Sequence, residues 1–107
     1  MRRKPTEQQY EARACVMKAL AHPDRLKIID VLSRKERCLC ELEPLFRTDK
    51  STLSRHISAL RNAGIVRERR EGVRVYLTLA TPCILNIFDC TMKVIQADTK
   101  RKQEWKK

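Results

Sequence analysis

The stretch LCELEPLFRTDKSTLSRHISALRNAG, residues 39–64, sets the architecture of this chain. Its first part, Leu39 to Phe46, has the apolar spacing of a short helix, and the polar residues 47–49 form a turn after it. The second part, Lys50 to Ala63, carries one apolar face at helical spacing: Leu53, Ile57 and Leu60. Gly64 ends this helix because glycine accepts the left-handed conformation of a helix C-terminus. Two helices joined by so short a turn predict a helix-turn-helix.

Two further helices are predicted before this stretch. Thr6 has the residue type of an N-cap, and the helical spacing of apolar residues continues from it to Ala21. The residue before a proline avoids helical geometry, so Pro23 separates this helix from a second one that ends near Ser33.

A change of period after Gly64 predicts a β-hairpin and then a last helix. Apolar and arginine-rich positions alternate from Val66 to Leu79 around a turn at 70–72, and the helical period returns from Pro82. The expected fold class is mainly α with a β-hairpin wing, a winged helix-turn-helix. One small core leaves apolar faces uncovered on the terminal helices, so we expect a homodimer through the first and last helices.

Length, charge and composition narrow the class of protein. The 107 residues suit a single domain, 1–107, with flexible ends at 1–5 and about 99–107. A net charge of +11 indicates a polyanionic partner, nucleic acid or an anionic membrane surface. No apolar run has the roughly 20 residues of a membrane span, and no signal peptide is recognised, so a cytoplasmic protein without membrane contact is expected. No constellation of nucleophile, base and orienting residue points to an enzyme.

The polar face of the helix from Lys50 to Ala63 has the side chains that a DNA-recognition helix needs. Small hydroxyl residues allow close approach to the major groove, and Arg55 is long enough for a bidentate guanine contact. Arginines around the hairpin suit contacts with the phosphate backbone or the minor groove of double-stranded DNA. The predicted DNA contacts are Lys50, Ser51, Thr52, Ser54, Arg55, His56, Arg61, Arg67, Arg69, Arg70 and Arg74.

Cys38 and Cys40 form a C-x-C pair at the start of the predicted third helix. In a regular helix residues i and i+2 point about 200° apart, so the two sulfurs grip one ion only where the backbone is extended or irregular. Pro44 weakens this turn because it lacks the N–H that the carbonyl of Cys40 would accept. Thiolate ligands favour soft ions over hard ones. The pair therefore predicts a soft-ion site next to the recognition helix.

Four segments in this order resemble the ArsR/SmtB family of metalloregulatory repressors: KALAHPDRLKIIDVL (18–32), CLCEL (38–42), STLSRHISALRNAGIV (51–66) and REGVRVYLTL (70–79). The resemblance implies a homodimeric winged helix-turn-helix repressor that binds an inverted repeat in operator DNA and leaves when a toxic ion binds. ERCLCEL is similar to the cysteine box of the arsenic-, antimony-, cadmium- and lead-responsive members, the arsenic-responsive branch being most similar. As(III) or Sb(III) is then the expected inducer, with Cd(II) or Pb(II) as the alternative.

The resemblance leaves the third ligand open, because Glu43 stands where some arsenic-responsive members have a third cysteine. Members of the cadmium/lead branch recruit an N-terminal thiol from the partner subunit, which makes Cys15 the preferred third ligand. Cys83 and Cys90 lie seven residues apart on the predicted last helix, where they form a possible second site or are small buried apolar residues.

Two other functions compete with the ion-responsive repressor. A thiol redox switch of the same fold would release DNA on oxidation in the absence of metal. A nonspecific basic architectural protein would bind DNA without protecting a single inverted repeat.

Overall fold

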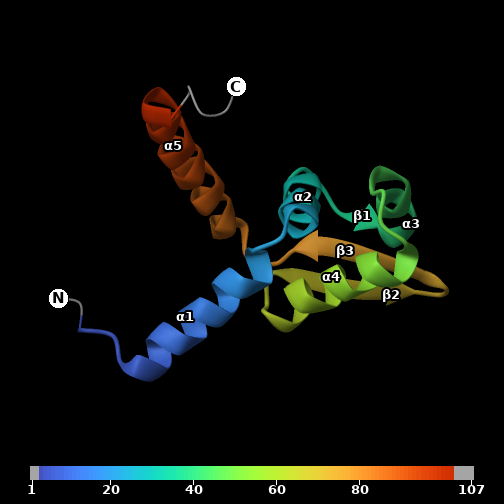
Figure 1. The fold of residues 1–107 in the computed structure, drawn as a ribbon. Helices are drawn as coiled ribbons and strands as arrows, with labels where there is room; N and C mark the ends of the chain where they lie inside the picture. Colours follow the sequence, from blue (N-terminus) through green and yellow to red (C-terminus); the bar gives the residue numbers. More distant parts are fainter. Residues whose placement is uncertain (1–2, 103–107) are drawn as a thin grey trace.

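The computed structural model describes residues 3–102, with side chains described as far as Thr99. Helices and strands follow the order of a winged helix-turn-helix, as predicted (Figure 1). The elements are α1 (Glu7–Leu20), α2 (Pro23–Leu32), β1 (Arg37–Cys38), α3 (Leu39–Leu42), the 3-10 helix η1 (Glu43–Leu45), α4 (Lys50–Asn62), β2 (Val66–Glu71), β3 (Arg74–Leu79), the 3-10 helix η2 (Pro82–Ile84) and α5 (Leu85–Lys102).

Local hydrogen bonds explain where the helices begin and end. Thr6 caps α1 through a reciprocal pair, in which the backbone N–H of Gln9 donates to its hydroxyl and its own N–H donates to the side chain of Gln9. The imidazole Nδ1 of His22 accepts from the backbone N–H of Asp24 and so caps α2. Gly64 follows α4 with a φ of 82°, the left-handed conformation predicted for it.

Three sequence-based boundaries differ from the structure. The predicted third helix, Leu39 to Phe46, is one α-turn followed by the 3-10 helix η1, because Pro44 cannot donate to the carbonyl of Cys40. The hairpin turns at Gly72 (φ 63°) and Val73, two residues later than expected, since β2 continues to Glu71. Helix α5 runs to Lys102, so the part of the predicted flexible end from 99 to 102 is helical.

The flexible ends are only partly within the described residues. Residues 3–5 have no regular secondary structure, whereas 1–2 and 103–107 lie outside the described part of the chain.

A three-stranded antiparallel sheet in the order β1-β3-β2 carries the wing. The short strand β1 was not predicted: Arg37 pairs with Leu77 and Cys38 pairs with Tyr76. Because β1 leads directly into α3, the start of the helix-turn-helix is attached to the central strand of the wing.

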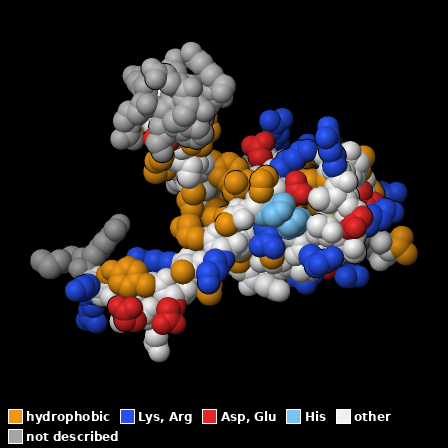
Figure 2. Space-filling view, in the orientation of Figure 1, with side chains coloured by type: hydrophobic (Ala, Val, Ile, Leu, Met, Phe, Trp, Pro, Cys, Tyr) orange, Lys and Arg blue, Asp and Glu red, His pale blue; other side chains and the backbone are white. Residues whose placement is uncertain are grey.

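The core lies between α2, α4 and one face of the sheet. Its fully buried side chains come from these three and from the end of α3: Ile28, Ile29, Leu42, Leu53, Leu60 and Leu77. Helices α1 and α5 diverge from this body, and hydrophobic side chains gather along α5 where it leaves the body (Figures 1 and 2). Within residues 3–102 no helix is both long and apolar enough to span a membrane.

Candidate functional site

Asp49 is the N-cap of helix α4, and its side chain is hydrogen-bonded to the first turn. The carboxylate of Asp49 accepts hydrogen bonds from the backbone N–H of Thr52 at 2.7 Å and from the hydroxyl of Ser51 at 3.0 Å. These bonds, led by the one from the Thr52 backbone, lower the pKa of Asp49 below its usual value. The carboxylate thereby fixes the first turn of the helix that carries the predicted DNA contacts.

The outer face of α4 presents most of the predicted contacts. Leu53, Ile57 and Leu60 are buried against the core, which turns the opposite side outward. Exposed there are Lys50, Ser51, Ser54, Arg55 and Arg61, with Thr52 half-buried. Arg61 lies at the far end of this face, where its guanidinium pairs with Glu68 of β2 at 2.9 Å.

His56 does not belong with these contacts, and its predicted role at DNA is wrong. Its side chain is buried, with 6% exposed, and its Nδ1 accepts a 3.0 Å hydrogen bond from Nε of Arg25. Its ring lies against His22 with centroids 4.3 Å apart, and its Nε2 faces Asp24 at 4.0 Å. At i+3 from Leu53, His56 falls on the inner side of the helix. It ties α4 to the start of α2 instead of reading DNA.

The arginines of the wing divide into paired and free groups. Arg69 pairs with Glu36 at 2.9 Å and with Glu71, and its guanidinium lies 4.5 Å from the ring of Tyr76. Arg70 pairs with Glu68 at 3.2 Å. Arg67 is exposed on β2 and forms no ion pair with the described residues. The paired arginines stiffen the hairpin, and Arg67 presents an uncompensated charge to a polyanion.

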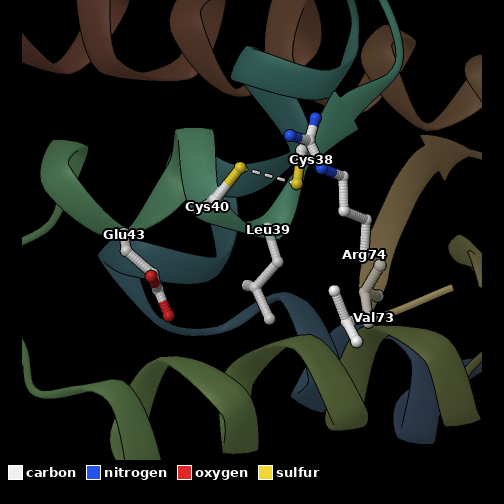
Figure 3. Close-up of a pocket in the computed structure, with 7 residues that line it drawn as sticks. Cys38, Leu39, Cys40, Glu43, Val73 and Arg74 are labelled. Carbon is white, nitrogen blue, oxygen red and sulfur yellow. Dashed lines mark hydrogen bonds between the residues drawn. The ribbon is translucent and has the colours of Figure 1, made fainter.

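The thiols of Cys38 and Cys40 lie together at the base of the wing. The Cys40 thiol donates a hydrogen bond to the sulfur of Cys38, with the Sγ atoms 2.6 Å apart (Figure 3). Cys38 ends β1 in extended backbone (φ −70°, ψ 144°), whereas Cys40 lies in the first turn of α3. The strand-to-helix junction supplies the irregular backbone that convergence of residues i and i+2 requires.

The two thiols differ in exposure and acidity. Cys38 is buried and Cys40 is exposed. The hydrogen bond from the Cys40 thiol, with further help from the Cys40 backbone and Arg74, lowers the pKa of Cys38. The same bond holds the proton on Cys40, so its pKa is raised. Figure 3 shows the guanidinium of Arg74 beside the Cys38 thiol. Cys38 is therefore the first thiolate to form.

A pocket of about 330 Å³ opens over this thiol pair. Its walls come from the helix-turn-helix and from the wing: Cys38, Leu39, Cys40, Glu43, Val73, Arg74 and Val75. Sequence reasoning assigned Arg74 to DNA and missed that it faces the thiols. The two-residue pairing of β1 with β3, which produces this contact, is too short to leave a period in the sequence.

The remaining cysteines do not join the pair within one protomer. Cys15, Cys83 and Cys90 are all exposed. Cys83 lies in η2 and Cys90 in α5, so they do not share one face of a continuous α-helix as predicted. Among the described residues, the one group of three metal-ligating side chains is His22, Asp24 and His56, away from the thiols.

An apolar groove of about 450 Å³ lies between α1 and α5. Three apolar side chains that line it are about half exposed: Met17 at 51%, Met92 at 50% and Ile95 at 49%. Such exposure is large for apolar side chains that share one surface. Exposed apolar patches of this kind are typical of protein interfaces.

The chain is similar to a family model and to several known bacterial regulators. Residues 22–68 match the family model described as bacterial regulatory protein, arsR family. The chain is 34% identical over 80 residues to a transcriptional repressor SmtB homolog of Synechocystis, 40% over 67 residues to a cadmium resistance regulatory protein CadC homolog of Staphylococcus aureus, and 36% over 63 residues to an arsenical resistance operon repressor of Staphylococcus xylosus. These matches cover 75%, 62% and 59% of this chain, and 61%, 55% and 61% of the three relatives.

Two solved structures share the fold over nearly the whole chain. Rv0081 of Mycobacterium tuberculosis superposes with a TM-score of 0.78 at 31% identity, covering 91% of this chain and 98% of that one. A homodimeric winged helix-turn-helix DNA-binding domain of Mycobacterium bovis, described as a possible ArsR-family transcriptional regulator, superposes with a TM-score of 0.71 at 28% identity and covers 95% of each chain. This chain belongs to the ArsR family of bacterial regulatory proteins.

Proposed function

We propose that this protein is a metalloid-responsive transcriptional repressor, which binds operator DNA as a homodimer and is released when As(III) or Sb(III) binds Cys38 and Cys40. The observation that carries the proposal is the contact of the two sulfurs at the base of the wing. Two adjacent thiols, one of them with a lowered pKa, are suited to capture of a thiophilic ion, since the thiolate is the binding form.

DNA binding in this proposal uses the outer face of α4 and the wing. Arg55, Ser51 and Ser54 reach base edges in the major groove, and Lys50 approaches phosphate at the amino end of the helix. Arg67, Arg70 and Arg74 contact the backbone beside it. The net charge of +11 supports a partner of this kind.

Two protomers joined along α1 and α5 present two recognition helices to an inverted repeat. The groove between these helices, lined by Met17, Met92 and Ile95, supports this dimer because one protomer leaves it open. The homodimeric domain of Mycobacterium bovis gives a precedent for the assembly.

In this proposal, ion binding at the thiols weakens DNA binding because it first changes the position of the wing. Cys38 pairs with Tyr76 on β3, and the ring of Tyr76 lies against Arg69. Bonding both sulfurs to one ion replaces their hydrogen bond and changes their separation, which shifts β1 against β3. The ion weakens DNA binding to the extent that it binds the shifted state more tightly.

A cadmium- or lead-responsive repressor is the second candidate. The name of the Staphylococcus aureus relative favours it, and a thiol from the partner, with Cys15 as the candidate, would complete its site. A redox switch of the same pair is the third, supported by the lowered pKa of Cys38. An architectural DNA-binding role is the fourth, and it requires no ligand.

Footprinting on genomic DNA separates these candidates. The proposal predicts protection of one inverted repeat and its loss on addition of As(III) under reducing conditions. Loss with Cd(II) or Pb(II) only, in a manner that depends on Cys15, indicates the second candidate. Loss with peroxide alone indicates the third, and protection without sequence preference indicates an architectural protein.

A further inference from the structure

We propose that His22, Asp24 and His56 form a binding site for a divalent transition-metal ion such as Zn(II). The site is separate from the thiol pair and goes beyond the proposed function. It lies where the start of α2 meets the inner side of α4, and one ligand atom from each of the three side chains lies within 4.8 Å of the other two. Imidazole nitrogen and carboxylate oxygen are both ligands that zinc accepts in proteins.

The imidazole of His56 brings an unpaired nitrogen to this site. Its Nε2 is buried without a hydrogen-bond partner among the described residues, and the side chain is more than nine-tenths buried. A carboxylate oxygen of Asp24 lies 4.0 Å from Nε2, too far for a hydrogen bond. A buried polar atom that is left unpaired destabilises a fold. A metal ion between these two atoms would satisfy both of them.

The spacing of the three side chains fits one ion after a small movement. Zinc lies about 2.0–2.2 Å from nitrogen and oxygen ligands, so two ligands of a tetrahedral ion are roughly 3.4 Å apart. His56 and Asp24 must therefore approach by less than about 1 Å. His22 is exposed and Asp24 is half-buried, which leaves both free to adjust. Figure 2 shows that histidine side chains reach the molecular surface, where an ion can enter from solvent.

An ion at this site competes with Arg25 for the ring of His56. Nδ1 of His56 accepts a hydrogen bond from Nε of Arg25 at 3.0 Å, so the neutral ring carries its proton on Nε2. An ion at Nε2 moves that proton to Nδ1, which can then no longer accept from Arg25. His22 makes the same exchange at the cap of α2 when it binds through Nε2. Ion binding thus releases a contact that holds α4 against α2.

The test measures zinc binding by the full chain with all five cysteines replaced by serine, so that no thiol supplies a ligand. Zn(II) is titrated in competition with a chelating dye, and we expect saturation at one ion per protomer. His22→Asn removes the imidazole but keeps an N-cap acceptor, and Asp24→Asn removes only the charge. Each should weaken zinc binding at least about tenfold. Asp30→Asn, which alters a carboxylate of the same helix outside the cluster, should leave the affinity unchanged.

The position of the imidazole proton gives a second measurement, in which His56 itself is not altered. The chain has two histidines, so a nuclear magnetic resonance spectrum of the protein with isotope-labelled histidine separates them. We expect the His56 proton on Nε2 in the metal-free protein and on Nδ1 in the zinc-saturated protein.

Three results would overturn the proposal. The first is the absence of zinc binding by the cysteine-free protein. The second is an affinity in His22→Asn or Asp24→Asn equal to that of the cysteine-free parent, as expected if only water bridges these groups. The third is a His56 proton that stays on Nε2 in the zinc-saturated protein. None of them bears on the proposed response to As(III), because the thiols are absent from this protein.

Discussion

The thiol of Cys40 donates a hydrogen bond to the sulfur of Cys38, with the two Sγ atoms 2.6 Å apart. The chain bends from β1 into α3 between these residues, so side chains that would diverge on a helix meet. Arg74 of the neighbouring strand adds a positive charge beside them. The site that captures the ion is thus built from the helix-turn-helix and the wing together.

Replacing Cys40 by alanine should raise the pKa of Cys38, because the largest cause of its lowering is the hydrogen bond from the Cys40 thiol. Arg74→Ala should raise it by a smaller amount, since Arg74 contributes only through its charge. The measurement is the ultraviolet absorbance of thiolate against pH in the protein whose other cysteines are serine. Arg67→Ala, which removes a wing arginine outside the pocket, is the control. An unchanged titration in Cys40→Ala contradicts the assigned hydrogen bond.

Arg55 and His56 are neighbours on α4, but we expect Arg55 to contribute to operator binding and His56 to contribute to folding stability. Arg55→Ala should weaken operator binding by about tenfold or more and change the free energy of unfolding by less than about 0.5 kcal/mol. His56→Ala should lower the free energy of unfolding by about 1–3 kcal/mol, because it leaves the half-buried Nε–H of Arg25 without its acceptor. Urea denaturation and fluorescence anisotropy with operator DNA measure the two quantities. Equal losses of stability in both variants would refute the division between outer and inner faces.

Burial of His56, followed by the charges of His22 and Arg25, lowers its pKa below the usual 6.5. The unfolded chain therefore binds a proton at a higher pH than the folded one does. The contribution of His56 to stability is complete above about pH 6.5, the usual pKa of histidine. It is lost as the pH falls through the lower pKa of the folded state. His56→Gln should flatten this part of the curve of unfolding free energy against pH. A slope that persists in His56→Gln would assign it to another group.

A charge in the apolar groove should separate the protomers. Met92→Glu places a carboxylate among the side chains of α1 and α5, and we expect the dimer dissociation constant to rise by at least about tenfold. Lys93→Glu changes the charge of an adjacent, exposed residue that does not line the groove, and should have a much smaller effect. Sedimentation equilibrium measures both. A Met92→Glu protein that remains dimeric at the concentration of the parent contradicts the proposed interface.

The salt dependence of operator binding reports the phosphate contacts of the wing. Arg67→Ala should reduce the slope of log K against log salt by about one, because one released counterion is lost. Arg69→Ala should change the slope less, because Glu36 and Glu71 already neutralise that guanidinium. Similar changes in the two variants would show that the ion pairs of Arg69 open on DNA.

The sequence alone predicted those elements whose apolar residues repeat at a regular spacing or whose ends carry a residue of special backbone geometry. The spacing of Leu53, Ile57 and Leu60 predicted α4, and Gly64 marked its end. His56 was misplaced because a histidine beside arginine in a polar sequence resembles a surface residue, and only the position of Arg25 reveals that it is buried.

The thiol pair was foreseen, but its neighbours were not. Strand β1 has two residues, too few for an alternating pattern, so its pairing with β3 depends on tertiary contacts. That pairing is what brings Arg74 and Val73 to the thiols and forms the pocket.

Operator release by As(III) in paired cysteine variants tests the proposed function. The operator, obtained by footprinting, carries a fluorophore, and anisotropy is followed under reducing conditions while As(III) is added. The protein with Cys15, Cys83 and Cys90 replaced by serine should release DNA as the parent does. Cys38→Ser/Cys40→Ser should bind the operator with the parent's affinity and stay bound throughout. Release from the Cys38→Ser/Cys40→Ser protein at the parent's As(III) concentration would contradict the assignment of the sensing site.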